Sequence, residues 1–112
     1  MAWLSKIYKK TPNVSDIGYY NMDKVLSIRV QEDAKYASFK FEFINGTTIE
    51  YRFPKDPKEV PPEDLDKVIS QLESLMDYFK RAEKPVSTLY FLADRIRSTY
   101  ARYRWETQPK KW

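Results

Sequence analysis

The sequence predicts an α+β fold: an antiparallel sheet of three or four strands, packed on one face by two long antiparallel helices, with a short helical segment at the N-terminus. Apolar residues alternate with polar ones between residues 23 and 53, which is the period of half-buried strands. They recur every three to four residues in 62–81 and in 86–105, which is the period of amphipathic helices. One domain is expected over 1–112, with the tail 106–112 as a candidate for disorder.

Two short segments precede the predicted sheet. Apolar side chains near the N-terminus have the spacing of one side of a short helix: Trp3, Leu4, Ile7 and Tyr8. We expect this helix, within residues 1–10, to close one end of the core. Residues 11–22 contain Pro, Asn, Ser, Asp and Gly, which favour turns, and this composition predicts an irregular connection.

The predicted strands have one apolar face and one polar face. Their apolar residues are Leu26, Ile28 and Val30, then Phe39, Phe41 and Phe43, then Ile49, Tyr51 and Phe53. This alternation predicts three antiparallel strands with one buried face. The polar face carries charges of both signs, namely Arg29, Lys40, Arg52, Glu42 and Glu50. Such a mixture is typical of a solvated face held by cross-strand pairs, and the floor of a binding surface is the alternative.

The Asn45-Gly46 pair marks the turn between the second and third strands. A two-residue loop would pair Phe41 with Glu50, which places a phenylalanine and a carboxylate on one face. One extra loop residue restores the alternation, because Phe41 then lies opposite Ile49 or Tyr51. We therefore predict a three-residue loop with Gly46 in the left-handed bulge position.

Four prolines between residues 54 and 62 predict a stiff connector that leaves the sheet. Pro62 suits the first turn of a helix, where the missing N–H loses no partner. The helix is expected over 62–81, and it ends with Lys80 and Arg81, the charge that a helix carboxyl terminus favours. The short break at 82–85 predicts that the last helix folds back antiparallel to it.

The last helix has two stripes of large side chains on opposite sides. The first can dock on a core and consists of Leu89, Leu92, Ala93, Ile96, Tyr100 and Tyr103. The second, here called the outer stripe, consists of Phe91, Arg95, Ser98, Arg102 and Trp105. A helix that docks on one side is expected to show water a polar back, so rings set between arginines on that back indicate a function.

The residue types that the chain lacks exclude several classes of function. It has no cysteine and no histidine, which excludes disulfides, thiolate or histidine metal sites, and Ser-His-Asp or Cys-His catalysis. Two glycines, Gly18 and Gly46, cannot form a glycine-rich phosphate loop. We therefore expect no cofactor and no metal. The apolar runs are short and the N-terminus lacks a secretory pattern, so we expect a cytoplasmic protein with no membrane partner.

The net charge of +4 is unevenly distributed along the chain. Residues 86–112 carry six basic and two acidic side chains, and this excess favours a polyanion as partner. Asn and Gln number only three each while Lys, Arg and Glu are abundant, a bias that predicts a thermophilic source. In size and charge layout the chain is broadly similar to small single-strand-binding proteins of thermophilic archaea that lack an OB-fold, and no shared motif carries that similarity.

The charge and the outer stripe together predict a sequence-tolerant binder of single-stranded DNA or RNA, and not an enzyme. Such proteins need cations that follow the phosphates and exposed rings on which bases stack. Arginine suits this role because its planar group stacks and also binds phosphate through two hydrogen bonds. The residues expected to contact nucleic acid are Phe91, Arg95, Arg102, Arg104, Trp105, Lys110 and Lys111, with Tyr90 and Trp112 as further rings.

Three alternatives stay open at this point. The outer stripe is also typical of a protein interface, and a homodimer built on it is compatible with nucleic-acid binding. The last helix could enter the groove of duplex DNA, although the helix pair lacks the tight turn of a helix-turn-helix. Asp33-Ala34-Lys35, with Glu50 nearby, is similar to part of a nuclease element, but a turn at 32–35 accounts for both charged residues.

Overall fold

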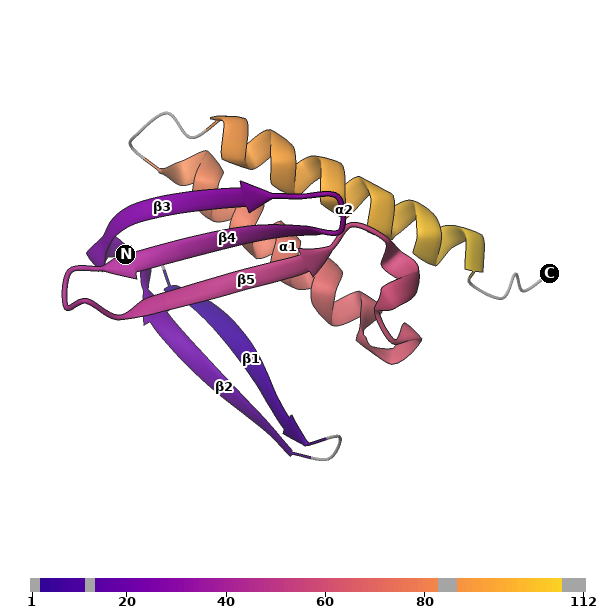
Figure 1. The fold of residues 1–112 in the computed structure, drawn as a ribbon, viewed down its shortest axis with the longest axis horizontal. Coiled ribbons are helices and arrows are strands. Elements are labelled where there is room, and N and C mark those ends of the chain that lie inside the picture. The colour runs from indigo at the N-terminus through magenta and orange to yellow at the C-terminus, as the bar shows by residue number, and fades with distance from the viewer. Residues whose placement is uncertain (1–2, 12–13, 83–86, 108–112) are drawn as a thin grey trace. The chain divides into compact units, whose positions relative to one another are not determined.

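The computed structural model describes residues 3–11, 14–82 and 87–107 (Figure 1). The chain divides into two compact units, Met1–Phe53 and Pro54–Trp112. The first unit is built from antiparallel strands and the second from helices. The α+β class expected from the sequence is therefore confirmed.

Five strands make two antiparallel sheets. β1 (Trp3–Thr11) pairs with β2 (Val14–Asn21), and a single 3-10 turn follows at Met22–Lys24. The second sheet has the order β3-β4-β5, and its strands are β3 (Val25–Glu32), β4 (Tyr36–Phe43) and β5 (Thr48–Pro54). The three-stranded sheet was expected, and the pair β1–β2 was not.

The predicted helix within residues 1–10 and the irregular connection at 11–22 are both wrong, because the two segments pair as strands. Lys6 lies opposite Gly18, and Ile7 lies opposite Ile17. A helix of ten residues has little stability of its own in water. Pairing gives both backbones hydrogen-bond partners, and the spacing of a few apolar residues in one segment does not show that a partner strand follows.

Gly18, a turn former in sequence terms, has a packing role in β2. A Cβ added to it would lie 3.0 Å from Cε2 of Tyr20, so the glycine leaves room for that ring. The Tyr20 ring also contacts Phe43 of β4, with 5.8 Å between the ring centroids. The glycine thus lets an aromatic side chain cover the strand and join the two sheets of the first unit.

The buried face of the second sheet follows the predicted alternation in β4 and β5. Phe39 and Phe41 are 0% exposed, and their rings make edge contacts with Phe53 and Tyr51 at centroid distances of 6.0 and 5.8 Å. β3 does not follow this alternation at its start, because its register against β4 shifts between Val25 and Ser27. Leu26 lies in that irregularity and is 64% exposed, so its predicted place in the core is wrong.

The hairpin between β4 and β5 has the predicted three-residue loop. The Phe43 N–H donates to the Thr47 carbonyl (2.8 Å), and the Gly46 N–H donates to the Phe43 carbonyl (2.9 Å). Gly46 has a φ of +86°, which is the left-handed conformation that favours glycine. Counting outward from Phe43 and Thr47 places Lys40 opposite Glu50, and these two side chains form an ion pair of 3.9 Å.

The second unit begins with two 3-10 turns, Pro57–Glu59 and Pro62–Asp64, followed by α1 (Leu65–Arg81) and α2 (Ser87–Thr107). The two helices run antiparallel beside each other, as expected (Figure 1). Their buried side chains are Leu65, Leu72, Leu75 and Phe79 on α1 and Leu92, Ala93, Ile96 and Tyr100 on α2. α2 continues through Glu106 and Thr107, and residues 108–112 lie outside the described part of the chain.

Tyr100 connects α2 to the start of the proline-rich connector. Its hydroxyl donates a 2.6 Å hydrogen bond to the carbonyl of Pro54, and its side chain is fully buried. Burial raises the pKa of Tyr100, and the nearby carboxylates of Glu59 and Asp56 raise it further. The inner side of α2 is therefore held by a partly buried hydrogen bond as well as by apolar packing.

Candidate functional site

The outer stripe of α2 is exposed along its length. Phe91 is 65% exposed and Trp105 is 71% exposed, and both rank among the exposed large apolar side chains of the described residues. Arg95, Ser98 and Arg102 between them are exposed as well. The opposite side of the helix holds the buried residues of α2, so the large exposed rings do not serve the packing of the helix.

The dimensions of the stripe follow from helix geometry. Phe91, Ser98 and Trp105 succeed one another every seven residues, and the two arginines lie between them. At 1.5 Å per residue, the two rings are separated by about 21 Å along the helix axis. Glu106 is exposed one turn beyond Arg102, and it is the acidic neighbour of this end of the stripe. The stripe therefore offers a ring at each end with positive charge between them.

Arg104 lies on a different side of α2, facing α1. It forms an ion pair with Asp66 at the start of α1, in which Nη2 lies 3.5 Å from Oδ2 in addition to a closer contact through Nε. Arg104 was predicted to bind nucleic acid together with the residues of the outer stripe, but the structure places it away from that stripe. Lys110 and Lys111, also predicted to bind nucleic acid, lie outside the described residues, as does Trp112.

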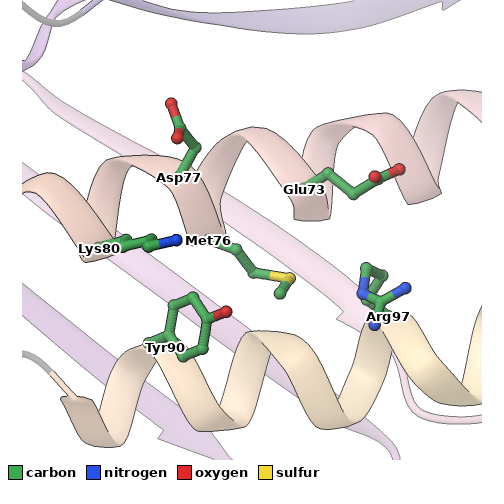
Figure 2. Close-up of a pocket in the computed structure, with 6 residues that line it drawn as sticks. All are labelled: Glu73, Met76, Asp77, Lys80, Tyr90 and Arg97. Atoms are coloured by element: carbon green, nitrogen blue, oxygen red, sulfur yellow. The ribbon is translucent and has the colours of Figure 1, made fainter.

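A pocket of about 270 Å³ lies between α1 and α2 (Figure 2). It is lined by Glu73, Met76, Asp77, Lys80, Tyr90 and Arg97. Lys80 and Tyr90 lie toward one end, Glu73 and Arg97 toward the other, and Met76 extends between them (Figure 2). Of these residues, only Tyr90 was expected from the sequence to take part in binding. The antiparallel pairing of the helices brings them together, and their positions in sequence do not show it.

Two of the pocket residues are already engaged with neighbours. Arg97 donates from Nη2 to Oδ1 of Asp94 at 3.0 Å, while its Nε is buried without a hydrogen-bond partner within the described residues. Asp77 forms an ion pair of 3.2 Å with Arg81, one turn along α1. In Figure 2 the Asp77 carboxylate points away from Met76 and Tyr90, whereas the Glu73 carboxylate lies along α1 at the end of the pocket where Arg97 is found.

The pocket and the outer stripe meet at two adjacent residues of α2. The rings of Tyr90 and Phe91 are 5.7 Å apart between centroids, at an interplanar angle of 81°. Tyr90 lines the pocket, and Phe91 begins the stripe. A ligand in contact with the exposed Phe91 ring would therefore have the pocket directly beside it.

The polar face of the second sheet was the other surface considered for binding. Arg29 lies opposite Lys40, which is itself paired with Glu50. The Arg52 guanidinium lies 3.9 Å from the centroid of the Tyr36 ring. The Lys40–Glu50 ion pair and the contact of Arg52 with Tyr36 are of the kind that holds a solvated face together.

The acidic residue of the nuclease-like segment has a local role in the structure. Asp33 Oδ1 accepts hydrogen bonds from the backbone N–H groups of Lys35 (2.8 Å) and Tyr36 (2.7 Å). Asp33 thus shapes the turn between β3 and β4, which is the role that the turn interpretation expected.

Among residues 3–11, 14–82 and 87–107, no group of three or more acidic, cysteine or histidine side chains could hold a metal ion. Neither α1 nor α2 has the length and apolar character needed to cross a membrane. No protein-family model, curated protein or solved structure matches the chain.

Proposed function

We propose that the protein binds single-stranded nucleic acid, DNA or RNA, along the outer stripe of α2. The observation that carries the proposal is the exposure of Phe91 (65%) and Trp105 (71%) on the same side of the helix as Arg95 and Arg102. Each base that stacks on an aromatic ring contributes about 1–3 kcal/mol, and this interaction tolerates any base. The arginines supply the charge that the phosphates require.

A single strand suits this surface better than a duplex. The rings need the flat faces of bases, and base stacking inside a duplex hides those faces. Reading a duplex through a helix depends instead on side chains that hydrogen-bond to base edges in the groove. Phe91 has no side-chain hydrogen-bonding group and Trp105 has a single N–H, so neither can read a base edge through two hydrogen bonds. Their exposure therefore supports binding of a single strand.

Charge also supports nucleic acid over self-association through the same stripe. Arg95 and Arg102 are nearly symmetric about Ser98. An antiparallel second copy would therefore bring each of these arginines against an arginine of the other copy. Like charges that face each other across an interface cost free energy, whereas a polyanion is attracted by the same side chains.

The test is a fluorescence titration of the full chain with an oligo-dT of about 12 nucleotides, a length within the site sizes of single-strand binders. We expect quenching of tryptophan fluorescence and an affinity that falls steeply between about 50 and 200 mM salt, because bound counterions are released on binding. Trp105→Ala removes the quenched fluorophore, so it is followed by the anisotropy of a labelled strand, and it should weaken binding at every salt concentration by about 5- to 150-fold, the loss of one stacked base. Trp105→Phe is the matched control, because it keeps a ring and should retain most of the affinity.

Arg95→Ala and Arg102→Ala should each flatten the dependence of log affinity on log salt by about 0.7, the value for one phosphate contact with a single strand. Absence of binding to both oligo-dT and oligo-U at low salt would refute the proposal. Light scattering in the same buffer then examines the alternative, since a protein interface on the outer stripe requires an oligomer or a bound partner.

A further inference from the structure

We infer that the pocket between α1 and α2 is a subsite for a single base, and that it prefers guanine. The inference rests on the proposed function, because the base would belong to a strand bound along the outer stripe. The bound strand would then prefer guanine at one nucleotide position, while the outer stripe accepts any base at the others. The contact between Tyr90 and Phe91 is what connects the two, since the ring that lines the pocket touches the ring that begins the stripe.

The size and walls of the pocket suit one flat ring system. Its volume of about 270 Å³ lies below the roughly 300–1,000 Å³ that is common for drug-sized ligands. Met76 and Tyr90 provide a polarizable thioether and an aromatic ring, both of which make favourable contacts with the face or edge of an aromatic ligand. In single strands, unstacked bases are often recognised in this way.

The polar groups of the pocket include a carboxylate and two cations. Glu73 and Arg97 lie at one end, and Lys80 lies at the other (Figure 2). The carboxylate of Asp77 is directed away and paired with Arg81, so it does not compete for a ligand. A ligand that fits must therefore present hydrogen-bond donors to Glu73 and acceptors to Lys80 or Arg97.

Guanine meets both requirements within one base. Its N1–H and N2–H₂ groups are adjacent donors, which the two oxygens of a carboxylate accept together. Its O6 and N7 are acceptors, for which lysine and arginine are the usual partners. Adenine offers a donor beside an acceptor on its Watson–Crick edge, and uracil and thymine offer one donor between two acceptors. None of these three bases gives the carboxylate of Glu73 two donors side by side.

The unsatisfied Nε of Arg97 is consistent with a ligand that brings an acceptor. A buried donor without a partner is unfavourable, and native structures contain few of them. A small rotation of the guanidinium toward O6 of a bound base would satisfy this N–H. Nη2 of the same guanidinium is paired with Asp94, which limits this rotation to a small one.

The test compares oligo-dT strands that differ at one position, titrated against the full chain. A single dG near the middle should bind at least about fivefold tighter than dT, dA or dC at that position, the lower end of what one well-placed pair of hydrogen bonds discriminates. Inosine, which lacks the N2 amino group, should lose most of the gain. Glu73→Gln should abolish the preference for dG, and its affinity for plain oligo-dT should match that of Asp77→Asn, which removes the same negative charge.

Asp77→Asn is the matched control, because Asp77 also lines the pocket but is directed away from it and should keep the preference. Both carboxylates are exposed, so neither substitution should change the unfolding curve. Oligo-dT that binds with no gain from dG overturns the guanine inference and leaves the proposed function standing. If no strand binds, the proposed function fails, and a titration with free GMP then tests whether the pocket binds guanine. Saturable binding of GMP that Glu73→Gln removes would support the guanine inference. Absence of GMP binding would overturn it.

Discussion

The two helices of the second unit have similar lengths and different surfaces. α1 buries four large side chains on one side and shows no large exposed apolar residue elsewhere. α2 also buries four residues on one side, yet it exposes Phe91 and Trp105 on the other. α1 therefore leaves no large apolar side chain exposed, whereas α2 leaves two. Packing within the described residues does not account for these two rings, and the proposed binding surface would account for them.

The charges of the two helices differ in the same direction. α1 carries three acidic and three basic side chains, so its net charge is zero. α2 carries four arginines against Asp94 and Glu106. Because the helices are adjacent and antiparallel, the polar groove between them has carboxylates from one and guanidinium groups from the other. The pocket between the helices accordingly takes its carboxylates from α1 and its guanidinium group from α2.

The largest effect is expected from removing a packing residue of α1. Leu75 is 0% exposed, and Leu75→Ala should lower the free energy of unfolding by about 2–5 kcal/mol, because the substitution leaves a cavity. Phe91→Ala, a larger truncation on the exposed side of α2, should change it by no more than about 0.5 kcal/mol. Urea unfolding followed by circular dichroism measures both. A loss of stability for Phe91→Ala as large as that for Leu75→Ala would show that the outer stripe is a packing surface.

A smaller effect is expected on the inner side of α2. Tyr100→Phe removes the hydrogen bond to the Pro54 carbonyl and leaves that acceptor unpaired, which should cost about 1–3 kcal/mol of the unfolding free energy. Oligonucleotide affinity should not change, because Tyr100 is buried opposite the outer stripe.

The pH dependence gives this prediction its own signature. The pKa of Tyr100 is raised in the folded protein, first by burial and then by Glu59 and Asp56. The stabilisation is therefore complete below the unfolded pKa of about 10 and is lost as pH rises through the folded value. Wild type should lose stability above about pH 10 more steeply than Tyr100→Phe. Equal slopes in alkaline urea titrations would show that the buried hydroxyl does not carry this difference.

Local patterns predicted the parts of the fold that local physics determines. The predicted length of the loop at Asn45-Gly46 and the predicted conformation of Gly46 were both confirmed. The length could be predicted because a loop shorter by one residue would have put a carboxylate on the buried face. The helices were correct because their apolar periods extend over several turns. β1 and β2 were not predicted because strand pairing depends on two segments, and neither segment alone shows its partner. Gly18 was predicted to be a turn residue because its contact with the Tyr20 ring is visible only in the structure.

The part of the candidate site that lies on one helix could be predicted from the sequence, and the part that two helices form could not. Phe91, Arg95, Arg102 and Trp105 belong to one helix, so rotation about a single axis was enough to group them. The pocket needs residues of both helices, and Leu26 needs the irregular register between β3 and β4 to become exposed. Contacts of this kind depend on which residue of one element lies opposite which residue of another, and the pattern within either element does not encode that.

The smallest effect, and the sharpest test of the difference between the two sides of α2, is expected for Arg104. Its ion pair with Asp66 joins side chains that are 45% and 71% exposed, so Arg104→Ala should lower the free energy of unfolding by at most about 1 kcal/mol. Because its guanidinium faces α1, the substitution should leave the salt dependence of oligo-dT binding unchanged. Arg102→Ala, two residues away on the outer stripe, should flatten it by about 0.7. If both substitutions flatten it equally, the phosphates follow the groove beside α1 as well, and the strand crosses the helix instead of running along it.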